Sequence, residues 1–191
     1  MTVLLRSLRE KDGPRVLAWR NQPEVAAYMY SDHHISQDEH ARWLTNALNL
    51  ADRRFWIIEF DGAPVGLANL AKIDLVNRKC EWAYYLADPS VRGRGVGAQV
   101  EFAVLDYVFR PLDLNKLWCE VLIENEPVWK LHESFGFQRE ALFRSHVLKD
   151  GRFRDAVGLG LLSADWAQVR PACGARLRDR GVDLEVQAIV T

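Results

Sequence analysis

The stretch Arg92-Gly93-Arg94-Gly95-Val96-Gly97 is the most informative fold signal in the sequence, because it joins an expected strand to an expected helix through three glycines. Residues 79–87 before it are rich in aromatic side chains that favour strands, and residues 96–109 after it carry apolar side chains at helical spacing. Amides in such a turn point outward together with the positive end of the helix dipole. The glycines leave room for an anion, and Arg92 and Arg94 add charge, so the turn predicts a diphosphate cradle.

Two other diphosphate-binding motifs fit this turn less well. A Walker A loop would end in Gly-Lys-Ser/Thr, whereas this turn ends in Gly97-Ala98. A dinucleotide fingerprint is nominally present at Gly93, Gly95 and Ala98, but it should open an early βαβ unit. The acid that the fingerprint needs, Asp113, comes before the next strand rather than at its end. A glycine turn that merely connects two elements is the remaining alternative.

The pattern on both sides of the turn predicts one α/β (α+β) domain with a mixed, mostly antiparallel sheet flanked by helices. Ser36 with Glu39 forms a capping box, and Asp61-Gly62 is a hairpin turn. The strands are expected at residues 3–9, 55–60, 65–73, 79–87, 117–123, 142–148 and 153–162. The helices are expected at residues 10–20, weakly at 25–30, from 36, at 96–109 and from 127. The domain is expected to span residues 1–165, followed by a solvated tail at 166–191 that is rich in arginine.

Composition excludes several classes of protein. The 191 residues are 49% hydrophobic and 27% charged, with a net charge of −1, so a basic surface for nucleic acid is not expected. The three cysteines, Cys80, Cys119 and Cys173, are odd in number and far apart, which predicts neither disulfides nor a zinc site. The sequence shows no signal segment and no membrane span, so we expect a cytoplasmic protein without a membrane partner.

The pattern Arg92-x-x-Gly95-x-Gly97, with Asn125 and Gly136-Phe137 downstream, resembles the GCN5-related N-acetyltransferases (GNAT family) over roughly residues 2–163. The resemblance implies acetyl-CoA as cosubstrate, no metal, and two central strands that splay apart to admit the pantetheine arm. It implies that the glycine turn holds the pyrophosphate, that Asn125 contacts the arm, and that a backbone N–H near Leu86 receives the oxyanion. The implied cofactor-binding residues are Leu86, Arg92, Gly93, Arg94, Gly95, Val96, Gly97 and Asn125.

Short matches narrow the resemblance within the family. Stretches 19–23, 29–31, 35–36, 71–73, 120–121 and 124–125, together with His40, are similar to the amino-sugar acetyltransferases of pseudaminic (nonulosonic) acid biosynthesis. Those enzymes acetylate the 4-amine of a UDP-linked 4-amino-4,6-dideoxy sugar that serves surface or flagellin glycosylation. The ribosomal-protein N-terminal acetyltransferases have a very similar general pattern. A polyamine acceptor and a non-catalytic acetyl-CoA-binding module also remain open.

The chemistry of amide formation suggests two catalytic residues. A neutral amine must attack the thioester, so a base or a water chain has to remove a proton. Glu120 is the first candidate and Glu81 the second, although either could be an outward-facing strand residue. His132 stands four residues before Gly136-Phe137, where many relatives carry a tyrosine that protonates the departing thiolate. Alternatively, His132 is a partly buried helix residue without a catalytic role, and a water molecule protonates the thiolate.

The acceptor is expected to be a small-molecule UDP-amino sugar. Arg20, His40 and Lys72 would meet its phosphates or hydroxyls, since Arg forms a fork and Lys a point charge. Tyr30 would stack on uracil or the sugar, although single aromatic residues more often belong to the core. The sequence leaves both a monomer and a homodimer open.

Overall fold

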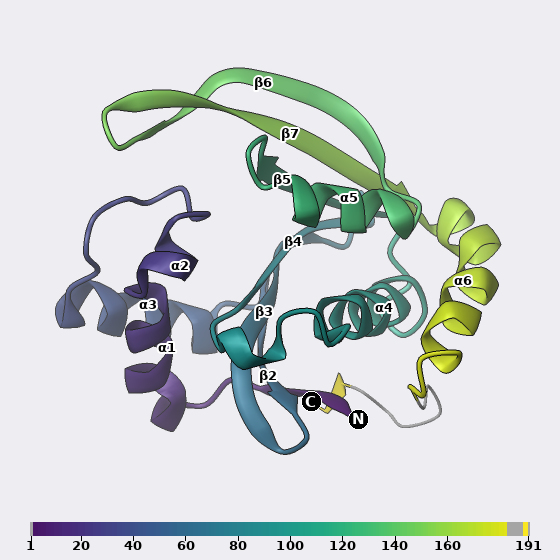
Figure 1. Cartoon of the computed structure of the whole chain (residues 1–191), viewed down its shortest axis with the longest axis horizontal. Helices are drawn as coiled ribbons and strands as arrows, with labels where there is room; N and C mark the ends of the chain where they lie inside the picture. The colour runs from purple at the N-terminus through teal and green to yellow at the C-terminus, as the bar shows by residue number, and fades with distance from the viewer. Residues whose placement is uncertain (1, 183–188, 191) are drawn as a thin grey trace.

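The computed structural model of the chain describes residues 2–182 and 189–190 and has two helical layers around one sheet (Figure 1). The strands are β1 (Val3–Ser7), β2 (Arg54–Phe60), β3 (Ala63–Asp74), β4 (Lys79–Leu86), β5 (Lys116–Leu122), β6 (Gln138–Lys149), β7 (Arg152–Leu162) and β8 (Ile189–Val190). The α-helices are α1 (Gly13–Arg20), α2 (Pro23–Ala26), α3 (Gln37–Asn49), α4 (Val96–Phe109), α5 (Glu126–Ser134) and α6 (Ser163–Arg178). Short 3₁₀ turns lie at Glu10–Asp12 and Pro89–Val91.

The described strands form one eight-stranded sheet in the order β6-β7-β5-β4-β3-β2-β1-β8. Only the β4–β5 and β1–β8 pairs are parallel, so the predicted mixed, mostly antiparallel sheet is confirmed. Helices α1–α3 lie on one side of the sheet and α4 and α6 on the other, while the β6–β7 hairpin arches toward α2 (Figure 1). In the described part of the chain no helix is long and apolar enough to cross a membrane.

Local sequence signals locate most elements. The Oγ of Ser36 accepts the backbone N–H of Glu39 at 3.2 Å, so the predicted start of α3 is confirmed. The β2–β3 hairpin turns at Asp61-Gly62, where both residues have the positive φ that this turn requires. Helix α4 spans Val96–Phe109, as its apolar spacing predicts.

The prediction of a solvated tail at 166–191 is wrong for its first part, because α6 begins at Ser163 and packs against α4. Trp166 and Leu177 are 2% and 4% exposed within the main core. Arg170 donates to the carboxylate of Asp106 on α4 at 2.6 and 2.7 Å. The helical pattern of α6 is hard to see in the sequence, because the helix contains several arginines and an internal proline. Residues 183–188 and 191 of the expected tail lie outside the described residues.

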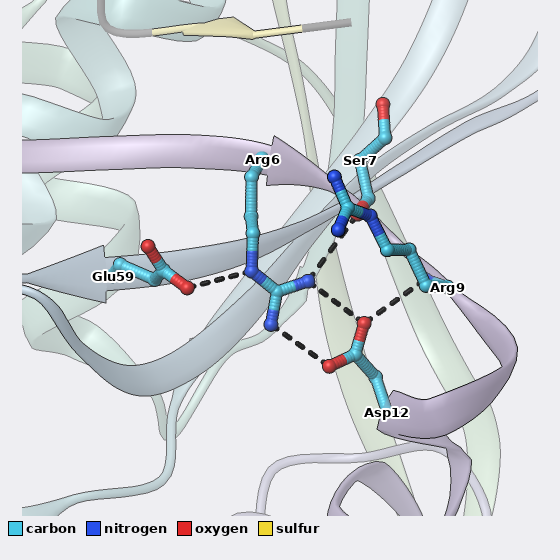
Figure 2. Close-up of polar contacts among 5 residues, drawn as sticks. All are labelled: Arg6, Ser7, Arg9, Asp12 and Glu59. Carbon is cyan, nitrogen blue, oxygen red and sulfur yellow. Dashed lines mark hydrogen bonds and ion pairs between the residues drawn. The ribbon is translucent and has the colours of Figure 1, made fainter.

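A part-buried arginine ties the start of α1 to the sheet (Figure 2). Arg6 on β1 donates from Nε to Glu59 on β2 at 2.6 Å and from both terminal nitrogens to Asp12 at 2.8 Å. Asp12 also accepts the backbone N–H of Arg9 at 2.9 Å. Burial would raise the pKa of Asp12, but the hydrogen bonds from Arg6 and Arg9 hold this pKa below its ordinary value. The network fixes where α1 leaves the sheet, and therefore where Arg20 at its other end lies.

Candidate active site

The two central strands separate halfway along their length. β4 and β5 pair only from Lys79↔Lys116 to Glu81↔Trp118, and both strands continue beyond that point without pairing to each other. The expected splayed pair is therefore confirmed. The N–H of Ala87 donates to Val65 at 2.8 Å, and neighbouring amides along a strand point to opposite edges. The N–H of Leu86 consequently points toward β5, into the opening.

The glycine turn follows directly on this opening. Gly93 and Gly95 both have a φ of +74°, in the left-handed region that favours glycine, and α4 begins at Val96. An ideal Cβ on either glycine would meet nothing within 4 Å, so the backbone here is open to a ligand. The first amides of α4 have no partner within the helix and suit a diphosphate. The guanidinium of Arg94 lies 4.5 Å over the Phe60 ring and 3.9 Å from Asp61, toward the β2–β3 turn.

Asn125 marks the far side of the opening. It follows β5 directly and is the N-cap residue of α5, and its N–H donates to Leu122 at 2.9 Å. Asn125 therefore lies at the β5 end of the opening, and its contact with the pantetheine arm stays a prediction. Among the described residues, no cluster of three His, Cys, Asp or Glu side chains could hold a metal ion.

A cavity of about 300 Å³ lies on the α1–α3 face of the sheet. Its wall comes from α1, α3, the segment between α2 and α3, and strands β2–β4; the residues include Arg20, Ser31, His40, Asn69, Ala83 and Tyr85. Side chains of strand residues two apart share a face, so Ala83 and Tyr85 define the face that opens here. The sheet thus separates this cavity from α4 and α5.

The cavity contains two buried donors without acceptors. Arg20 donates to the sulfur of Met29 at 3.0 Å and to Ser31 Oγ at 3.1 Å. Among the described residues, neither Arg20 Nε nor the Tyr85 hydroxyl has a hydrogen-bond partner, and both atoms are buried. Burial raises the pKa of Tyr85 against the opposing effect of Arg20, so the hydroxyl keeps its proton. An oxygen-rich or anionic group would satisfy both donors.

Two further predicted acceptor residues, His40 and Lys72, do not lie in one site. His40 lines the cavity, but its Nε2–H donates to the Gly13 carbonyl at 2.8 Å. Burial lowers the pKa of His40, so the neutral ring offers Nδ1 as an acceptor, which suits a hydroxyl and not a phosphate. Lys72 is not among the cavity-lining residues; it pairs with Glu81 at 2.7 Å and lies 5.1 Å over Trp118. The expected grouping of Lys72 with Arg20 and His40 is corrected accordingly.

A second group on the same face joins three elements that are distant in sequence. The Tyr30 hydroxyl donates to Oε2 of Glu120 at 2.9 Å, and Nε2 of His146 on β6 lies 3.3 Å from the same oxygen. Trp118 pairs with Glu81 and Glu120 is two residues on, so Glu120 shares a face with Ala83 and Tyr85. Tyr30 is therefore held by Glu120 in the structure, and it does not line the cavity.

The other predicted catalytic residue lies on the opposite face of the splayed strands. His132 on α5 is 3% exposed, and its Nδ1 lies 2.9 Å from Oε1 of Glu101, which is fully buried on α4. Its ring packs 5.1 Å from Trp82 on β4. Burial alone would lower the pKa of His132, but the Glu101 carboxylate and the Cys119 thiol outweigh it and raise the pKa to about 10. The ring therefore keeps its proton at neutral pH.

Sequence reasoning missed Glu101, Tyr85 and His146. Glu101 carries a visible signal, since an acid interrupts the otherwise apolar positions of α4. Tyr85 follows Tyr84 in an aromatic strand, and the choice between them depends on which face the cavity occupies. His146 has no local signal.

Comparisons with known proteins identify the family and agree with the fold. A model of the acetyltransferase (GNAT) domain matches residues 2–138. Spermidine N(1)-acetyltransferase of Escherichia coli (strain K12) is 26% identical, covering 82% of this chain and 83% of its own length. Acetyltransferase PseH of Campylobacter jejuni is 25% identical, covering 64% and 74% respectively. A crystal structure of spermidine N-acetyltransferase from Vibrio cholerae with CoA and spermine has a TM-score of 0.81 at 23% identity and covers 87% of this chain and 98% of that one.

Proposed function

Because the chain belongs to the GNAT family of acetyl-CoA-dependent N-acetyltransferases, we propose that it acetylates the 4-amine of a UDP-linked 4-amino-4,6-dideoxy sugar, a step in pseudaminic acid biosynthesis. One observation carries this proposal: the acceptor-side cavity holds Arg20, with Nε buried and unpartnered among the described residues. A buried donor without an acceptor costs about 1–3 kcal/mol, and more when it is charged. A phosphate or a ring carbonyl would remove that cost.

The charge of Arg20 also separates candidate acceptors, while Glu39, which lines the cavity too, lies 3.0 Å from His33. A polyamine carries only positive charge apart from its reacting nitrogen, and a guanidinium in the same cavity would repel it. A nucleotide sugar carries the opposite charge and offers many oxygen acceptors. His40 Nδ1 suits a hydroxyl of such a sugar.

The proposed reaction uses both faces of the splayed strands. The glycine turn and the start of α4 hold the diphosphate of acetyl-CoA, and the Leu86 N–H receives the developing oxyanion. The acceptor nitrogen approaches from the cavity face, where Glu120 lies. His132 lies on the other face and, as a protonated imidazole, protonates the departing thiolate.

The test is an acceptor panel with purified protein and acetyl-CoA. Thiol release is followed with the UDP-amino sugar, with spermidine and with a peptide that has a free N-terminus. We expect the highest kcat/KM with the sugar nucleotide. A higher kcat/KM for spermidine or the peptide would contradict the proposal.

The Arg20→Ala variant tests whether Arg20 binds the acceptor. Loss of a charge-assisted contact should weaken acceptor binding by about 1.5–3 kcal/mol, which is roughly a 10- to 150-fold rise in KM for the sugar nucleotide. The KM for acetyl-CoA should stay unchanged. Arg15→Ala is the matched control, because Arg15 is an exposed arginine on the same helix. Equal effects of the two substitutions would place the acceptor elsewhere.

A polyamine acceptor is the second candidate. The spermidine acetyltransferase relative covers more of this chain than the PseH relative does. The carboxylates of Glu81 and Glu120 share the cavity-side face and could attract an ammonium group. This reading predicts that Arg20→Ala raises activity with spermidine, because a repelling charge is removed.

A further inference from the structure

We infer that His146 is the group that takes the proton from the acceptor amine, with Glu120 orienting its ring and Tyr30 fixing the carboxylate. The inference rests on acetyl transfer to an amine and not on which amine it is. Sequence reasoning considered Glu120 first and Glu81 second as the base and did not include His146, because nothing in the sequence connects residues 30, 120 and 146.

The geometry has the arrangement of a histidine oriented by an acid. Nε2 of His146 and the Tyr30 hydroxyl both contact Oε2 of Glu120, at 3.3 and 2.9 Å. The His146 ring is stacked on Phe143 at 4.9 Å and meets the edge of Tyr30 at 6.2 Å. Its orientation is therefore fixed from two sides, which general base catalysis requires.

The position of the cluster fits the acceptor side of the reaction. Glu120 lies on β5 beyond the last β4–β5 pair, beside the opening into which the Leu86 N–H points. It shares its face with Ala83 and Tyr85 of the cavity wall. An amine that reaches the opening from the cavity therefore passes this cluster and not the buried His132.

Exposure decides between the two members of the cluster. The side chain of His146 is 39% exposed and that of Glu120 is 19% exposed. A base must release its proton to water after each turnover, and the more exposed ring does so directly. Imidazole is also the side chain whose charge changes most readily between pH 5 and 8.

Two charged groups on β7, the strand that pairs with β6, are already engaged. On β7, the carboxylate of Asp155 accepts the Ser145 N–H at 2.7 Å, and Arg154 pairs with Glu124 at 3.1 Å. Tyr30, on the segment before α3, meets the His146 ring with its edge. Burial is the larger cause that raises the pKa of the Tyr30 hydroxyl, and the hydrogen bond with Glu120 is the next. Tyr30 therefore keeps its proton and serves as a donor to Glu120.

The proton balance is complete. The acceptor ammonium loses one proton to His146, the neutral nitrogen forms a bond with the acetyl carbon, and the carbon–sulfur bond breaks. His146 passes this first proton to water and then accepts the second proton of the nitrogen as the intermediate collapses. His132 protonates the departing thiolate and regains its proton from solvent, so the net reaction releases one proton.

The test compares His146→Gln with His34→Gln, an exposed histidine outside the cluster. With the acceptor from the panel that turns over fastest, we expect His146→Gln to lower kcat by about 10²-fold, within the range for general base catalysis. The acidic limb of its kcat/KM profile should move to higher pH, since the amine must then arrive already neutral. His34→Gln should match the wild type. A kcat within twofold of the wild type, or an unmoved acidic limb, would overturn the inference.

Two further variants separate proton transfer from packing. Adding imidazole should restore part of the activity of His146→Ala, which a purely structural role does not predict. Glu120→Gln combined with His146→Gln should be little slower than either alone, because the two residues act as one unit. If Glu120→Gln is slow while His146→Gln is not, Glu120 is the base and His146 is a neighbour.

Discussion

Two histidine–glutamate pairs flank the splayed strands, and they differ chiefly in their contact with water. In the pair between α4 and α5, the side chains of His132 and Glu101 are 4% and 0% exposed. In the pair between β5 and β6, those of His146 and Glu120 are 39% and 19% exposed. The buried pair holds its proton and suits an acid that acts late in the reaction. Water reaches the exposed pair, which suits the base that we infer, so burial separates the roles of the same residue types.

The two pairs are expected to differ most in what they contribute to stability. Removing one partner of a buried ion pair leaves an uncompensated charge, so Glu101→Ala should lower the free energy of unfolding by about 3–5 kcal/mol. Glu120→Ala removes the same side chain from a pair that water reaches, and it should cost about 1 kcal/mol or less. Urea denaturation measures both. Equal losses would show that the two pairs are buried to the same degree in solution.

Much of this arrangement could be predicted from local sequence. The turn at 92–97 and the apolar spacing of α4 depend only on neighbouring residues, and the structure agrees with them. The buried acid at Glu101 was also visible in principle, as a charge within the apolar pattern of that helix. Arg20 and His40 line one cavity, but they reached the candidate site through a family resemblance rather than through spacing.

The exposed pair could not be predicted, because it depends on long-range register. A shift in the β6–β7 pairing between Phe143 and Val147 sets the face on which His146 lies, and Ser145 has a φ of +51° within it. A slip of one residue moves a side chain to the other face of a strand. Lys72 was misplaced for a related reason: its φ of +50° falls where the β3–β4 register is irregular.

A kinetic variant tests the acid role of the buried pair. His132→Ala should slow turnover by about 10- to 10³-fold with little change in either KM, because the lost interaction exists mainly in the transition state. His132→Tyr restores the residue that many relatives carry and should keep substantial activity. Steady-state kinetics at saturating substrates measures both. A wild-type kcat in a folded His132→Ala protein would leave the pair with a purely structural role.

The pH dependence of stability also distinguishes the two pairs. Glu101 raises the pKa of His132 to about 10 against the opposing effect of burial, while an unfolded histidine titrates near 6.5. A group whose folded pKa is raised contributes stability that is complete below the unfolded value and is lost as the pH rises through the folded value. The stability that wild type has over His132→Asn should therefore be full below pH ~6.5, shrink above it and vanish beyond about pH 10. Urea midpoints between pH 6 and 10 measure this difference, and a difference that grows with pH would mean that His132 is buried in its neutral form.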